Sequence, residues 1–127
     1  QSQLQSLASF RRWAILTSSM AARAEHIKHS SREQPDAPAT LVFTPEEIET
    51  LILWRRKAAP NARQPCKPGE VPTLAEATRW VAEIGGYMKS RNAPPPGTVT
   101  IMRGLEYLEN LVQGRLLQIQ LSRDKLD

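Results

Sequence analysis

The segment that decides the fold is Gly85–Arg91, which reads Gly-Gly-Tyr-Met-Lys-Ser-Arg and separates two amphipathic patterns. Ahead of it, Thr73 and Glu76 have the spacing of a capping box, in which each side chain satisfies a backbone N–H group at a helix start. Apolar residues then recur at intervals of three or four, as on one face of a helix: Leu74, Ala77, Val81, Ile84 and Met88. The pattern predicts a helix that begins at Thr73 and continues through the double glycine.

Two adjacent glycines inside a helical pattern call for a physical reason. In a helix interior each glycine costs about 1 kcal/mol relative to alanine. We expect Gly85 and Gly86 to stand there because a neighbouring helix approaches too closely for Cβ atoms.

A last helix is predicted after the run 94–97, Pro-Pro-Pro-Gly, which forbids helix and favours an extended turn. It extends from about Thr98 to Arg123 and carries two stripes. The first suits the core of this chain: Met102, Leu105, Leu108, Val112, Leu116 and Ile119. The second lies on another face: Tyr107, Asn110, Leu111, Gly114, Gln118 and Leu121. A helix with two stripes is either central in its own domain or buries one face against another chain, and the pattern leaves both open.

The amino-terminal part predicts a long first helix over roughly residues 3–29. Its proposed inner face combines large and small side chains: Leu7, Phe10, Ala14, Thr17, Ala21 and Ala24. The segment 30–43 contains Pro35 and Pro38 among polar residues, which favours a mobile linker.

The residues Thr44–Glu47, Thr-Pro-Glu-Glu, predict the start of another helix. Thr44 is placed as the N-cap, Pro45 at the first helical position where its missing N–H costs nothing, and Glu47 completes a capping box. A short apolar face follows, made of Ile48, Leu51 and Ile52. The helix is expected to end before Pro60, because proline cannot continue a helix. Further prolines at 65, 68 and 72 predict an irregular connector after it.

Together these elements predict an all-α fold, a small bundle of about four helices with proline-rich connectors, as one domain over residues 1–127. The 127 residues, 40% of them apolar, allow one modest core. The chain begins with Gln1 rather than Met, so we expect it to be part of a longer polypeptide or a processed product.

Charge and cysteine content narrow the possible partners only in part. Seventeen basic and 13 acidic residues give a net charge of +4, which permits nucleic acid as a partner without requiring it. The densest basic segment has no acidic residue and consists of Arg55, Arg56, Lys57, Arg63 and Lys67, which either are solvated or contact phosphate. The single cysteine, Cys66, excludes an internal disulfide. Without a long apolar run or signal-peptide pattern, the chain is expected to be soluble and cytoplasmic, with no membrane partner.

Motifs that carry catalysis or bind metal are not found in the sequence. His26 and His29 are three residues apart, but no third ligand follows at metal-binding spacing, so they are interpreted as surface histidines. No phosphate-binding glycine loop and no nucleophile with a base and an orienting partner can be identified. We therefore expect no catalytic residue, no metal or cofactor, and no small-molecule substrate in this chain.

The order and spacing of the motifs resemble the C-terminal domain of bacterial cut-and-paste DNA transposases of the Tn-five type. The resemblance covers most of the chain after Phe43. Thr44–Glu47 is similar to the family's Thr-Pro-acidic-acidic helix start, and Gly85–Arg91 to its double glycine, aromatic, Met and Ser-basic pair. From Gly85 to Gly114 the spacing agrees without a gap. The segment from Leu4 to Met20 more weakly resembles the helix that leaves the catalytic domain, which implies that residues 1–29 are this helix and 44–127 the helical core.

The resemblance implies a function in pairing rather than in chemistry. In the family, a ribonuclease H-like domain with a DDE triad uses divalent cations, so Mg²⁺ is expected for a full-length parent but not for this chain. The domain joins two transposase subunits across a pair of transposon ends. The family's interface positions fall on Tyr107, Asn110, Leu111, Gly114 and Gln118, which implies a homodimer. Its DNA-contacting pair matches Ser90 and Arg91, with Lys89 beside them, which implies transposon-end DNA as a partner in the full-length context. The chain departs from the family in its run of three prolines and at Leu111, where the family can have a charge.

Two functions of other classes stay open. A stand-alone helical DNA-binding protein would use the basic segment after Trp54, although no helix-turn-helix pattern is present. A helical protein-interaction module would explain the last helix equally well but not the double-glycine motif.

Overall fold

The computed structural model describes residues 2–60, 70–88 and 94–126. For residues 2–10, 12–18 and 126 it describes the backbone alone. The described part contains four α-helices and a short 3-10 helix, and the all-α prediction is confirmed. In chain order they are α1 (Ser2–Glu33), η1 (Ala39–Leu41), α2 (Pro45–Ala58), α3 (Leu74–Ile84) and α4 (Thr98–Leu126).

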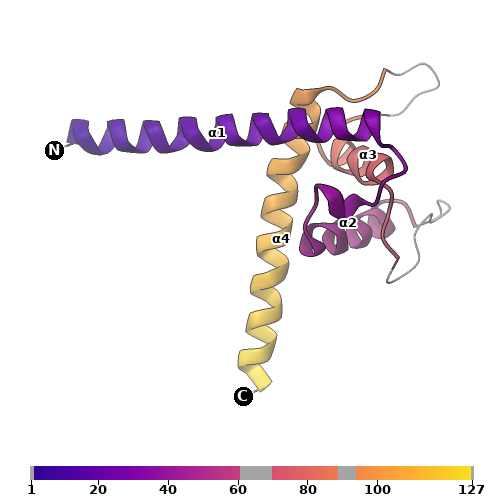
Figure 1. Ribbon diagram of the computed structural model, residues 1–127. Helices are drawn as coiled ribbons and strands as arrows, with labels where there is room; N and C mark the ends of the chain where they lie inside the picture. Colours follow the sequence, from indigo (N-terminus) through magenta and orange to yellow (C-terminus); the bar gives the residue numbers. More distant parts are fainter. Residues whose placement is uncertain (1, 61–69, 89–93, 127) are drawn as a thin grey trace.

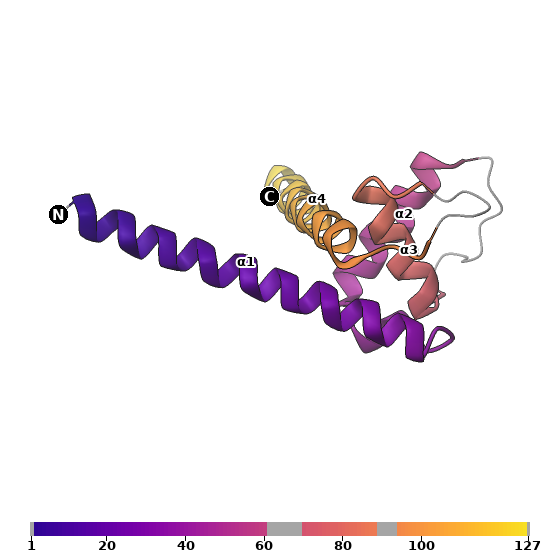
Figure 2. The ribbon, with the colours of Figure 1, turned by 90° about the horizontal axis from the view of Figure 1, so that it is seen from above.

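The helices make a compact body from which two long helices project (Figure 1). Helix α4 contacts α1, α2 and α3. The first half of α1 and the last half of α4 extend away from this body in different directions, with the chain termini at their far ends (Figures 1 and 2). The core holds large side chains that are fully buried: Trp80, Ile27, Leu51, Leu74, Ile101, Leu105, Leu108 and Val81.

Both predicted capping boxes are confirmed. At α2, the Thr44 Oγ1 accepts from the Glu47 backbone N–H at 3.2 Å, and the Glu47 carboxylate accepts from the Thr44 N–H at 2.9 Å. Thr73 and Glu76 make the same pair of bonds at the start of α3. Helix α2 ends at Ala58, ahead of Pro60 as expected. These starts depend on residues three positions apart, so local sequence suffices to define them.

The segment 30–43, predicted to be a mobile linker, includes the end of α1 and the helix η1 and packs against α3, so the predicted helix boundary at residue 29 is wrong. Helix α1 continues to Glu33, because no proline or glycine interrupts it before Pro35. The following carbonyl groups then accept from the first turn of α3: Ala37 from the Leu74 N–H at 2.7 Å, and Pro35 from the Ala75 N–H at 3.1 Å. Buried Ala39 and Phe43 complete the contact with the core.

The double glycine ends α3 rather than lying inside it, which corrects the predicted helix boundary. Gly86 has φ +99°, a left-handed conformation that favours glycine. Its N–H donates to the Glu83 carbonyl and the Tyr87 N–H to the Ala82 carbonyl, the two bonds of a Schellman motif. Because the helix ends here, Met88 is 85% exposed instead of continuing the apolar face.

The expected close helix approach does occur, at Gly85 and at a glycine that the sequence analysis did not single out. A Cβ atom on Gly85 would lie 2.3 Å from the Thr100 carbonyl oxygen. On the facing helix, a Cβ atom on Gly104 would lie 1.9 Å from the Val81 carbonyl oxygen. The close approach of α3 and α4 therefore depends on Gly104 and on Gly85, which directly follows the last residue of α3. At Gly86, where a close approach was also expected, a Cβ atom would meet none of the described residues within 4 Å.

Candidate dimerisation surface

Helix α4 divides into a half that builds the core and a half that leaves it. Ile101, Leu105, Leu108 and Val112 are buried in the body. From Gln113 to Lys125 every residue is exposed except half-buried Arg115. The helix extends beyond α2 and α3, so that after Leu116 none of the described helices lies beside it (Figure 1).

The residues assigned to a dimer interface are all exposed on α4, three of them on the outer side of its core-building half and two in its exposed half: Tyr107, Asn110, Leu111, Gly114 and Gln118. Their spacing places them along one side of the helix. Tyr107 is 56% exposed, and a Cβ atom on Gly114 would meet nothing within 4 Å. Contacts among the described residues therefore do not explain this mid-helix glycine, which costs about 1 kcal/mol relative to alanine.

The first stripe of α4 does not stay in the core over its whole length, which corrects its prediction. Leu105, Leu108 and Val112 are buried as expected, whereas Leu116 and Ile119 are exposed. Periodicity continues past the point where the other helices end, and it contains no information about that point. Leu117, which belonged to neither predicted stripe, is 59% exposed. We use the name outer face for the exposed apolar residues on the same side of the helix as Gly114, together with that glycine: Tyr107, Leu111, Gly114, Leu117 and Leu121. Leu116 and Ile119 are exposed on other sides of the helix.

An ion pair marks the boundary between the two halves. The Arg115 guanidinium lies 3.2 Å from the Glu49 carboxylate of α2. Beside it, a surface hollow of about 410 Å³ is enclosed by α1, α2 and α4 and is bordered by Glu46, Glu109 and Leu116. The only basic residue that lines it, Arg23, is already engaged.

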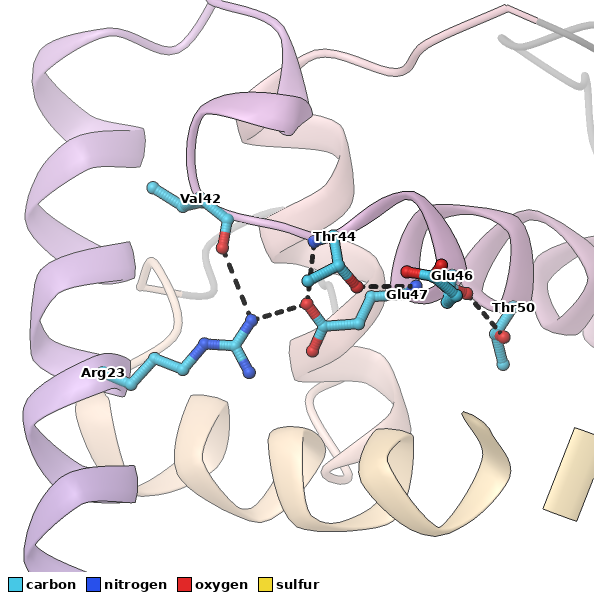
Figure 3. A network of polar contacts seen from close by, with 6 residues as sticks. All are labelled: Arg23, Val42, Thr44, Glu46, Glu47 and Thr50. Atoms are coloured by element: carbon cyan, nitrogen blue, oxygen red, sulfur yellow. Dashed lines mark hydrogen bonds and ion pairs between the residues drawn. The ribbon is translucent and has the colours of Figure 1, made fainter. Parts of the chain in front are cut away.

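Arg23 fastens α1 to the start of α2 (Figure 3). Its Nη2 donates to Glu47 Oε1 at 2.7 Å and to the Val42 carbonyl at 3.4 Å. The guanidinium also lies 5.9 Å from the centre of the Phe43 ring. Burial opposes ionisation of Glu47, but the hydrogen bonds from Arg23 and Thr44 outweigh it and lower the pKa of that carboxyl. The ionised Glu47 carboxylate thus joins α1 to the start of α2.

The residues assigned to DNA contact, Lys89, Ser90 and Arg91, lie outside the described residues, as do Arg63, Cys66 and Lys67. Of the remaining basic segment, Arg55 is not a free cation. Its Nη1 donates to Glu83 Oε2 at 2.6 Å and joins α2 to α3. The sequence could not reveal this pair, because its partners are far apart along the chain.

The histidines lie on the surface, as interpreted from the sequence. His29 is 3.1 Å from the Glu25 carboxylate, and Lys28 is 3.0 Å from the same group. A hydrogen bond from Thr98, together with Lys28 and His29, lowers the pKa of Glu25 to about 2. Within the described ranges, no three metal-binding side chains cluster. None of the helices described has the length and apolar character that crossing a membrane requires.

Comparison of the chain with protein-family models, with curated proteins and with solved structures found no match.

Proposed function

We propose that this chain is the dimerisation and synapsis domain of a cut-and-paste DNA transposase of the Tn-five type. Two copies would associate through the outer face of α4 and so join two transposase subunits across a pair of transposon ends. Catalysis would belong to a DDE domain of a longer parent protein with Mg²⁺, and the chain itself would have no nuclease activity. The setting would be the bacterial cytoplasm.

The single observation that carries the proposal is the exposed glycine at the centre of the outer face. A Cβ atom at Gly114 would meet none of the described residues within 4 Å, and leucines are exposed on both sides of it. A glycine among apolar residues lets a second helix cross closely, and a twofold arrangement would present the same patch from both copies. Exposed leucines on a free helix also favour burial against a partner.

The resemblance adds the identity of the partner and of the parent protein. The helix starts at Thr44 and Thr73, and the glycine pair at 85–86, are the features on which the similarity to transposases depends. The capping boxes and the Schellman motif give these residues structural roles in this chain. These roles support the proposed correspondence between the helices of this chain and those of the transposase domain. Capping boxes and Schellman motifs also occur in other helical proteins.

Association is tested by sedimentation of the 127-residue chain and of the variant Gly114→Arg. An arginine at this position adds a clash and a desolvated charge, and we expect it to weaken the dimer by roughly 3 kcal/mol. The matched control is Gln120→Arg, which adds the same charge to another face of the same exposed half. Helical content measured by circular dichroism should be the same in all three proteins. A dimer that Gly114→Arg leaves unchanged, or a parental chain that stays monomeric, would contradict the proposal.

A further inference from the structure

A second hollow, on the side of α3 that faces α1, has the opposite charge character to the first. It measures about 190 Å³. Among the described residues, its charged lining consists of Arg32 from α1 and Arg79 from α3, without a carboxylate. By contrast, the hollow beside α4 has three glutamates and one arginine. We use the name arginine site for the hollow of Arg32 and Arg79.

The two arginines have no ion-pair partner among the described residues, in contrast to three arginines that join helices of the body. Arg23, Arg55 and Arg115 each pair with a glutamate. The carboxylates near Arg79 on α3 are already used, because Glu76 caps the helix at Thr73 and Glu83 binds Arg55. Two unpaired guanidinium groups at one hollow repel each other, and an anion between them would relieve that repulsion.

The rest of the arginine site consists of a wall of aromatic and proline side chains and of a hydroxyl group without a hydrogen-bond partner among the described residues. Tyr87, Pro95 and Pro96 also line the hollow, and the Tyr87 hydroxyl donates to the Pro94 carbonyl at 2.8 Å. Thr78 contributes to the same lining, and its buried hydroxyl has no hydrogen-bond partner among the described residues. Prolines have fixed φ angles, so this wall is set before any ligand arrives.

We propose that Arg32 and Arg79 bind a phosphate group of a DNA backbone. Guanidinium groups bind phosphate oxygens in paired, charge-assisted hydrogen bonds, which a hollow of this size can accommodate at its open side. The inference rests on the proposed function, because that function makes DNA the polyanion the chain meets. Tyr87 and Pro95 lie on either side of residues 89–93, the segment assigned to DNA from the resemblance.

The test measures binding of the 127-residue chain to a labelled duplex of about 30 base pairs over a series of salt concentrations. The variant combines Arg32→Gln with Arg79→Gln. The control combines Arg56→Gln with Lys57→Gln, which removes the same charge from the end of α2. Loss of two phosphate contacts should weaken binding roughly 60-fold at about 0.1 M salt and lower the log-log salt slope by about 1.8. The control should change binding several-fold less.

The outcomes separate this proposal from its alternatives. An equal loss in the control would move the DNA path to α2 and overturn the assignment. If inorganic phosphate raises the melting temperature of the parental chain but not of the Arg32/Arg79 variant, while DNA binding is the same in both, the site takes a small anion and the DNA proposal is wrong. Displacement of DNA by polyglutamate at equal charge concentration would show a general polyanion site, which also contradicts it.

Association and DNA binding are measured on the same samples, so the two proposals can fail separately. A chain that stays monomeric but binds DNA through Arg32 and Arg79 contradicts only the dimer. A dimer that binds DNA equally well without these arginines contradicts only the arginine site.

Discussion

Gly104 and Gly114 belong to the same helix, yet among the described residues only the first is closely packed. A Cβ atom at Gly104 would lie 1.9 Å from the Val81 carbonyl oxygen, whereas one at Gly114 would meet nothing within 4 Å. The first glycine is explained by the crossing of α3 and α4. The second is unexplained until another molecule is placed against it, and this contrast separates the half of α4 that builds the fold from the half that we propose to pair.

Substitution of each glycine by alanine is expected to give the largest difference in the free energy of unfolding between the two positions. Gly104→Ala is expected to lower the free energy of unfolding by more than about 3 kcal/mol, above the usual cost of overpacking, because the obstructing atom belongs to the backbone. Gly114→Ala should instead raise it by up to about 1 kcal/mol through helix propensity. Urea unfolding at protein concentrations too low for association checks both. Changes of the same sign at both positions would show that the two glycines do not differ in the way described.

Leucines of the two halves provide the next test. Leu108 is fully buried and Leu117 is 59% exposed. Leu108→Ala is expected to cost about 2 to 3 kcal/mol of unfolding free energy, because it leaves a cavity in the core. Leu117→Ala should change monomer unfolding by less than about 0.5 kcal/mol and yet weaken association in sedimentation. A large loss of monomer stability from Leu117→Ala would mean that the outer face packs within the chain.

Acid should give the smallest effect, and it should act on the packed body of the molecule through Glu47 of α2. The folded-state pKa of Glu47 is lowered, so its contribution to stability is complete above the ordinary carboxyl pKa and is lost as pH falls through the lowered value. We expect the unfolding midpoint in urea to fall below about pH 4. Glu47→Gln should make this fall shallower, since the amide cannot titrate. Identical pH profiles for the two proteins would remove Glu47 as the cause.

The features predicted correctly from the sequence are those that a few neighbouring residues determine. Thr44 and Thr73 each cap a helix with a glutamate three positions later, and no distant contact is needed for that geometry. The all-α fold and the end of α2 before Pro60 follow from similarly local signals. The double glycine was misassigned because the apolar period continues to Met88, although the chain has already turned at Gly86.

The features that sequence reasoning missed depend on which segments meet. Leu116 and Ile119 have the period of a core face, but the other helices end before they reach them. Gly104 resembles Gly114 in the sequence, and only the position of α3 distinguishes them. Arg32 and Arg79 are brought to one hollow by the packing of α1 on α3. The paired glutamates of Arg23 and Arg55 are likewise distant along the chain, so composition alone could not separate structural cations from free ones.

The hydrogen bonds between residues 35–37 and the first turn of α3 fix the orientation of the end of α1 relative to α3. They join the end of α1 to the body through backbone groups, so a force on the far end of α1 would be transmitted to α3 and α4 instead of being absorbed by a slack connection. Helix α1 has 32 residues and a rise of about 48 Å. Helices α1 and α4 project from the same packed body in different directions (Figure 1). A domain attached at the amino end of α1 would therefore be held at a defined distance and direction from a partner bound at the carboxyl end of α4.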